Sequence, residues 1–125
     1  MCLQKVRKKQ TISQKNAITA WKEMQRVVGN KTVGITYVPS YQTCDIVFKR
    51  GLNTSKHPGF HVHLDKKEAL NSTRDYRRGH GDRDEYKIIK VKIWGRVRFG
   101  EQWNTQCASA TNMEIVNFTN HLRYR

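Results

Sequence analysis

The segment from Tyr86 to Phe99 alternates between apolar and basic residues with a period of two. This alternation predicts a β-strand, because successive side chains of a strand point to opposite faces of a sheet. Gly95 lies within the alternation, and we expect a bend or a bulge there. One face of the strand is apolar and can close a core. The apolar positions are Ile89, Val91, Ile93, Val97 and Phe99, and the opposite face holds Lys90, Lys92, Trp94, Arg96 and Arg98.

The chain as a whole is predicted to be α+β, a single compact domain with a mostly antiparallel sheet of five to six strands and one or two helices. Short alternating or β-branched runs predict the other strands, and clusters of Gly, Pro, Asn and Asp predict the connections. The expected strands are residues 33–38, 45–49, 60–64 and 107–118, and the expected turns and loops are 53–59, 77–85 and 100–106.

Two segments carry helical signals. Residues 65–76 begin with Asp65 as an N-cap, and Glu68 follows at the third helical position, which makes an aspartate variant of the capping box. Residues 17–28 show apolar side chains at helical spacing and predict a second helix. The competing interpretation of this segment is a short strand through Ile18, Ala20 and Trp21.

Positive charge is the dominant feature of the composition. The 125 residues include 24 Lys and Arg against 10 Asp and Glu, for a formal net charge of +14. Such an excess concentrates polyanions near the protein, and nucleic acid is the commonest of these partners. The length fits one domain. We place this domain at residues 17–125, after a basic N-terminal arm at residues 1–16.

The distribution of apolar residues and the number of cysteines indicate the cellular compartment. No apolar run approaches the ~18 residues of a spanning helix, and the basic N-terminal section is not followed by the apolar core of a secretory signal. The three widely spaced cysteines fit a reducing compartment better than a disulfide scaffold. We therefore expect a cytoplasmic protein that does not enter a membrane.

Basic and aromatic residues form the leading candidate site. Arginine makes forked contacts to phosphate, and an exposed tryptophan stacks on a base with about 1–3 kcal/mol. The alternative for Trp94 is burial under a helix. The expected nucleic-acid-binding residues are Lys90, Lys92, Trp94, Arg96, Arg98, Arg74, Arg77, Arg78, Arg7, Lys8 and Lys9.

Two histidines suggest a second kind of site. His61 and His63 share one face of the predicted strand 60–64, where both could reach a metal or act as general acid and base. Their spacing is similar to the start of the HxHxDH motif of metallo-β-lactamase-fold hydrolases, but Lys66 stands where that motif closes with a histidine. They also resemble the first cupin metal motif, without its leading glycine or its second motif. Because the capping box accounts for Asp65 and Glu68, we predict no metal and no cofactor.

Catalysis stays open as an alternative. A nuclease or transferase would use His61, His63 and a carboxylate such as Glu114. A thiol nucleophile, Cys44 or Cys107, would need the fold to bring a histidine to it. Buried structural cysteine is the expected state of both.

Three pieces of the chain together are similar to a group of small proteins encoded by phages and related mobile elements. The pieces are the N-terminal Met-Cys-Leu, the block GFHVHLDKKEAL at 59–70, and IIKVKIWGRVRFG at 88–100 with the later ASATNMEIV. The resemblance covers roughly residues 45–118. It implies an α+β fold and a viral or phage origin, and it brings no catalytic residue.

A second resemblance is to ADP-ribosyltransferase-like folds. Phe48-Lys49-Arg50-Gly51 is similar to their strand with Arg followed by Gly, residues 59–64 to the next strand, and Glu114 to the acidic position. This resemblance implies NAD chemistry, although the Ser-Thr-Ser type element is missing.

Together these observations favour a binding protein over an enzyme. We expect a small basic phage-type accessory protein that binds RNA or DNA, or a nucleoprotein, as an anti-CRISPR-like inhibitor of a host RNA-guided defence would. The alternatives are a small enzyme that uses His61 and His63, and a protein–protein inhibitor whose basic face docks on an acidic surface.

Overall fold

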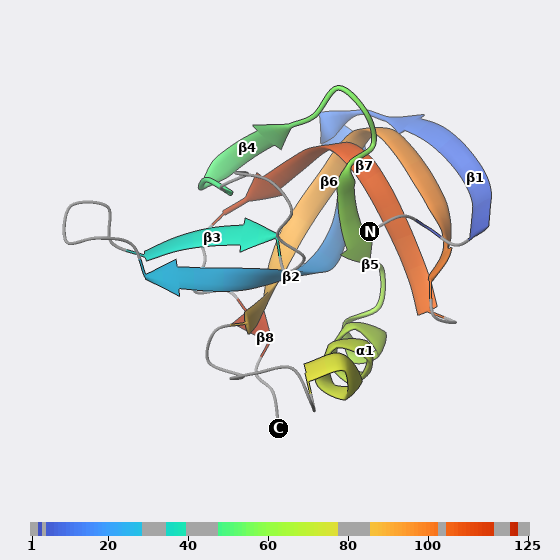
Figure 1. Ribbon diagram of the computed structural model, residues 1–125. Coiled ribbons are helices and arrows are strands. Elements are labelled where there is room, and N and C mark those ends of the chain that lie inside the picture. Colours follow the sequence, from blue (N-terminus) through green and yellow to red (C-terminus); the bar gives the residue numbers. More distant parts are fainter. Residues whose placement is uncertain are drawn as a thin grey trace.

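The computed structural model describes residues 3, 5–28, 35–39, 48–77, 86–102, 105–116 and 121–122 (Figure 1). These residues form a mostly antiparallel β-structure with one α-helix. The α+β description therefore holds only loosely. The elements are β1 (Lys5–Ile12), a 3-10 turn η1 (Gln14–Asn16), β2 (Ile18–Val28), β3 (Ile35–Pro39), β4 (Gly51–Thr54), β5 (Phe60–His63), α1 (Lys66–Arg77), β6 (Tyr86–Gln102), β7 (Thr105–Ile115) and β8 (His121–Leu122).

Four of the strands close into a small barrel. β6 pairs with β2 along one edge and with β7 along the other. β5 pairs with β7 and meets β2 through the single pair Trp21 and His63, which completes the ring. All of these pairings are antiparallel, as expected from the sequence. Figure 1 shows α1 below the barrel and the β2–β3 hairpin extending away from it to one side.

β6 is the strand around which the others are arranged. It runs over the whole predicted segment and continues to Gln102. Along one edge, the first half of β6 (Tyr86–Ile93) pairs with β2 and the second half (Gly95–Glu101) pairs with β1, and η1 lies between β1 and β2 in the sequence. At Gly95 the register with β7 shifts by one residue, and the φ angle of Gly95 is 90°. The predicted bulge is therefore confirmed, and a glycine occupies the position that needs positive φ.

The core lies inside the barrel. The predicted apolar face of β6 supplies Ile89, Val91, Ile93 and Val97, which are at most 2% exposed. Met24, Phe60 and Val62 pack in the same cluster, and small residues of β7 let the sheet close tightly around it. The two-residue alternation of β6 thus identified the main buried face, although Ile88 and Trp94, on the other parity, are buried too.

Three predicted segments have a different structure. Residues 18–28 form a strand and not a helix, so the competing strand interpretation is the correct one. The N-terminal arm is not a free end over its described part, because Lys5–Ile12 pairs with β6 from Gly95 to Glu101. The predicted turn at 100–106 is mostly strand, since β6 ends at Gln102 and β7 begins at Thr105.

Other predictions hold within the described residues. The strand 60–64 is observed as β5, and residues 35–39 of the predicted strand 33–38 form β3. The helix starts after Asp65, whose Oδ2 accepts a hydrogen bond from the Glu68 amide at 2.9 Å, which confirms the N-cap. Part of the expected loop 53–59 belongs instead to β4. Residues 45–47 and 78–85 lie outside the described residues.

Candidate nucleic-acid interface

Among the described residues, exposed cations gather where β1 pairs with β6. Lys9 is directly opposite Arg98, and Thr11 is directly opposite Arg96. Residues opposite each other in an antiparallel pair point to the same face with Cβ atoms about 5 Å apart. Lys9, Arg96 and Arg98 are all exposed. The register therefore places three cations side by side on one outer face, which we call the β1–β6 face.

An open hollow of about 280 Å³ lies on this face. Its rim and floor combine cationic, polar and small apolar groups. The guanidinium of Arg96 donates to the backbone carbonyl of Lys56, which fixes the loop before β5 against the end of the hollow. The lining residues are Lys9, Gln10, Thr11, Pro58, Arg96, Val97 and Arg98.

Little negative charge balances these cations. Arg7 is paired with Glu101, with Nε and Oε1 2.9 Å apart. In the described part of the chain, Lys9 and Arg98 have no carboxylate within ion-pair distance. Like charges directly opposite each other in a sheet are unfavourable by a few tenths of a kcal/mol or more. An anion bound between Lys9 and Arg98 would remove that repulsion.

Lys90 and Lys92, in the first half of β6, are exposed, but they belong to a different part of the surface. Lys90 is opposite Trp21, and Lys92 is opposite both Thr19 and Glu114. The carboxylate-bearing neighbour makes the surroundings of Lys92 less positive than those of Arg98. The bulge at Gly95 separates these lysines from Arg96.

The expectation that Trp94 is exposed is wrong. Its side chain is 8% exposed and packs in the core cluster, although its position in the alternation matches the cationic face. Trp94 directly precedes the bulge, and bulges commonly re-aim the neighbouring side chain. No base can stack on Trp94 in this arrangement, so the interface depends on charge and hydrogen bonding.

The remaining predicted contacts divide into two groups. Arg7, Lys8 and Lys9 are exposed on β1. Arg74 and Arg77 lie in α1, with side chains that the structure does not describe, and Arg78 lies outside the described residues. The structure therefore places the cations of β1 beside those of β6, and it gives no position for the arginine side chains of α1.

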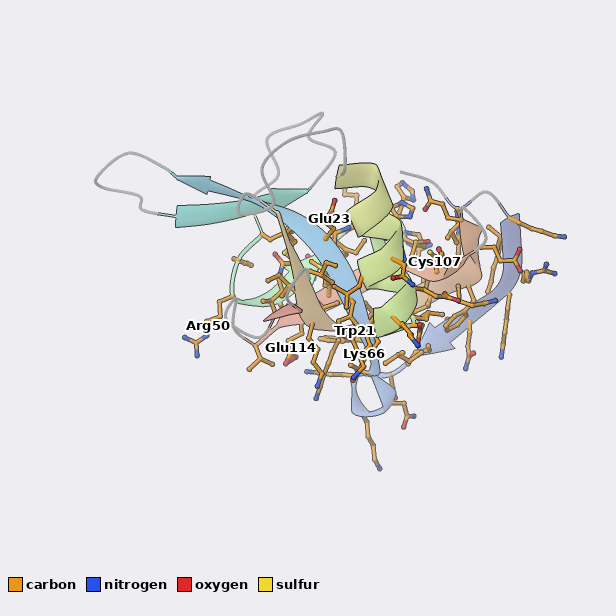
Figure 2. All side chains as sticks on the ribbon, turned by 90° about the horizontal axis from the view of Figure 1, so that it is seen from below. Trp21, Glu23, Arg50, Lys66, Cys107 and Glu114 are labelled. Carbon is orange, nitrogen blue, oxygen red and sulfur yellow. The ribbon has the colours of Figure 1, made fainter. Side chains whose placement is uncertain are left out.

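The histidines lie on the outer side of β5, next to α1. His61 is opposite Ser109 and His63 is opposite Cys107, and α1 packs against β2, β5 and β7. The Cys107 Sγ lies 3.6 Å from the His63 Nδ1, so the fold does bring a cysteine to a histidine. Figure 2 shows Cys107 beside α1, with Glu114 farther along the sheet toward Arg50.

Glu114 is too far away to act with these histidines. It lies five residues beyond Ser109 on β7, which corresponds to about 16 Å at ~3.3 Å per residue. The predicted catalytic set of His61, His63 and Glu114 is therefore not assembled. Glu68 is instead the carboxylate whose charge acts on His63, and it accepts a hydrogen bond from the Gln106 amide at 2.9 Å.

Burial keeps this histidine–cysteine cluster uncharged. It lowers the pKa of His61 to about 4 and also lowers the pKa of His63, and the charge of Lys22 adds to both effects. Burial raises the pKa of the Cys107 thiol, which is 3% exposed. A thiolate nucleophile needs the opposite shift, so the pair packs as a neutral thiol and imidazole.

Sequence reasoning missed Thr11, Gln10 and Pro58 as parts of the hollow. No local pattern marks them, because Gln10 and Thr11 meet Arg98 only through the register between β1 and β6, about 90 positions apart in sequence. Pro58 comes from the loop before β5, which the hydrogen bond from Arg96 to the Lys56 carbonyl holds at the hollow. Among the described residues, no group of three or more His, Cys, Asp or Glu side chains is arranged to hold a metal ion. Within that same part of the chain, no helix combines the length and apolarity of a membrane span.

Comparison of the chain with protein-family models, with curated proteins and with solved structures gives no match.

Proposed function

We propose that this protein binds nucleic acid, alone or within a nucleoprotein, through phosphate contacts made by the β1–β6 face. The observation that carries the proposal is the pairing of Lys9 with Arg98 beside an open hollow, with no carboxylate within ion-pair distance in the described residues. Arg98 offers a planar fork of donors for phosphate oxygens, and Lys9 offers a mobile point charge. The net charge of +14 brings polyanions to this face.

The mode of contact follows from the same residues. Successive residues on one face of β6, such as Arg96 and Arg98, are about 6.6 Å apart along the strand. The Thr11 hydroxyl, opposite Arg96 on the same face, can add an uncharged hydrogen bond to phosphate or sugar. Because Trp94 is buried, this face would contact the sugar–phosphate backbone of the nucleic acid and recognise its shape, with little selectivity between bases.

The biological setting that we propose is a phage-type accessory protein in the host cytoplasm. An inhibitor of an RNA-guided defence complex has to compete for, or cover, a nucleic-acid channel, and a small protein with a strongly basic face is suited to that task. The resemblance of residues 45–118 to small phage-encoded proteins supports this setting. The enzymatic alternative has less support, because Glu114 is distant and the histidine cluster is neutral.

A salt titration with matched variants tests the proposal. Binding of labelled duplex RNA, duplex DNA and single-stranded RNA is measured by mobility shift at about 50 mM and about 200 mM salt. We expect Lys9→Ala and Arg98→Ala each to weaken binding of every probe and to reduce the log–log salt slope by about 1. Lys49→Ala is the control, because Lys49 is an exposed cation before β4, outside the hollow.

Circular dichroism of each variant confirms that the fold is retained. If Lys49→Ala weakens binding as much as Lys9→Ala does, the net charge alone binds the probe and the β1–β6 face is not the interface. Salt-independent binding, or its absence at low salt, would exclude the phosphate mechanism altogether.

A further inference from the structure

The outer edge of β1 is a second surface of this protein, distinct from the face that carries the hollow. β1 pairs with β6 along one edge only, and it stands at the end of the strand order in the described part of the sheet. Figure 1 shows it at the margin of the molecule. Residues 5–11 are all exposed. The other edge of β1 therefore presents backbone N–H and C=O groups to which another strand could add.

The charge of β1 determines which strand can add. Lys5, Arg7, Lys8 and Lys9 make the strand strongly cationic, with no acidic residue between Lys5 and Ile12. Two copies of β1 pairing antiparallel would place cations opposite cations, which is unfavourable. Lysines on an edge strand protect against that kind of self-association. The same charges attract an acidic strand, so the lysines oppose pairing only with strands that are also basic.

The register between β1 and β6 shows which part of the β1 edge is regular. The register with β6 shifts between Val6 and Lys8, so Arg7 is an extra residue in β1. Arg7 is also held by its ion pair with Glu101. From Lys8 to Ile12 the pairing is uninterrupted, and it contains two cations whose side chains alternate between the two faces. This stretch of five residues has the length of a typical short strand.

We infer that the free edge of β1, from Lys8 to Ile12, binds an extended acidic segment of a partner protein by β-strand addition. Main-chain hydrogen bonds would supply the affinity, and glutamate or aspartate side chains of the added strand would lie beside Lys8 and Lys9. This inference does not rest on the proposed function. Phosphates would contact side chains on the β1–β6 face, whereas the added strand would contact the backbone at the edge, and Lys9 is, among the described cations, the one that both could reach.

Three kinds of synthetic peptide separate strand addition from simple charge attraction. The first is a labelled ten-residue peptide in which glutamate alternates with valine and threonine. The second has the same sequence with every other backbone nitrogen methylated, prepared in both alternations so that each possible hydrogen-bonding edge is blocked once. The third has lysine in place of glutamate. Binding to the full chain is measured by fluorescence anisotropy, and amide hydrogen exchange of residues 5–12 is measured with and without the first peptide.

We expect the acidic peptide to bind, one methylated form to lose at least about tenfold in affinity, and the basic peptide not to bind. Alternate amides of β1 should become protected from exchange, and Lys8→Glu should weaken peptide binding while Lys49→Glu has little effect. Equal binding of both methylated forms, or unchanged exchange in β1, would overturn strand addition and leave only charge attraction. Nucleic-acid binding without any peptide binding would overturn this inference and leave the proposed function standing.

Discussion

At the scale of single residues, Lys22 is the side chain least expected from its position. It lies on β2 between Ala20 and Met24, which are fully buried in the core, and it is opposite the buried Ile89. Its Nζ donates to the His61 carbonyl at 2.7 Å and lies 5.7 Å from the centre of the Phe48 ring. Burial lowers the pKa of Lys22 to about 8, and the neighbouring Glu23 opposes that shift.

The low pKa of Lys22 makes a prediction about stability at alkaline pH. Between pH ~8 and ~10.5 the unfolded chain binds more protons at Lys22 than the folded chain does, so its contribution raises the stability as pH increases. The whole shift corresponds to roughly 3 kcal/mol. We expect Lys22→Met to be more stable than the parent at pH 7 by about 1–3 kcal/mol, because a charged group no longer has to be desolvated.

Urea unfolding at pH 7 and at pH 9.5 measures this difference. The stability advantage of Lys22→Met over the parent should shrink at pH 9.5, where the parent lysine is mostly neutral. Lys67→Met, on the exposed surface of α1, is the control and should show no such change. A lower stability of Lys22→Met at both pH values would mean that the contacts to His61 and Phe48 outweigh the desolvation.

At the scale of elements, the attachment of β1 depends on Gly100. A Cβ atom at this position would come within 1.9 Å of the Lys5 backbone oxygen, and a backbone atom cannot move aside as a side chain can. Gly100→Ala should therefore push the first half of β1 away from β6. Because the nearest atoms to the added Cβ all belong to Lys5 and Val6 of β1, the paired core of β2, β5, β6 and β7 should remain folded.

Hydrogen exchange tests this prediction. In Gly100→Ala we expect faster exchange of amides in β1, most of all in its first half, and a loss of stability of about 1–3 kcal/mol. Nucleic-acid binding should also weaken, since Lys9 directly follows the displaced half and would be held less firmly opposite Arg98. Gly59→Ala is the matched control, because its nearest new contact is the flexible Ser55 side chain at 3.3 Å. Unchanged exchange in β1 would show that the strand adjusts to the extra methyl group.

The elements also show how far sequence patterns reach in this protein. β6 could be predicted because its two faces differ sharply in polarity over many residues. β2 was misassigned because its inward row includes Lys22, which interrupts the two-residue alternation, while Ala17, Trp21, Met24 and Val28 imitate helical spacing. The burial of Trp94 did not follow from the alternation. A bulge could be expected from Gly95, but its effect on the direction of the preceding side chain could not.

The sequence predicted the residue types of the candidate site, but not which of these residues lie side by side. Basic residues on β1 and on β6 were both expected to contact phosphate, and both are exposed. That Lys9 meets Arg98 depends on pairing between strands at opposite ends of the sequence. Such register is set by the closure of the whole sheet, so local periodicity carries no information about it. The contact between Cys107 and His63 is hidden from the sequence for the same reason.

At the scale of the whole molecule, the charge of +14 acts on folding as well as on binding. Like charges repel in the compact state, and salt screens this repulsion over about 10 Å at 0.1 M ionic strength. The described cations of β1 concentrate the repulsion at one margin of the sheet. The protein should therefore gain stability from ions that screen this margin, and gain most from anions that bind there.

Thermal unfolding in increasing salt measures that gain. Raising sodium chloride from about 20 mM to about 200 mM should raise the melting temperature, by roughly 3–5 °C for each kcal/mol of repulsion removed. Short polyphosphate should have the same effect at far lower concentration, because it would span Lys9 and Arg98. The variant Lys9→Ala should gain less from polyphosphate than Lys49→Ala, although both lose one charge. An equal gain in the two variants would assign the effect to net charge and not to the β1–β6 face.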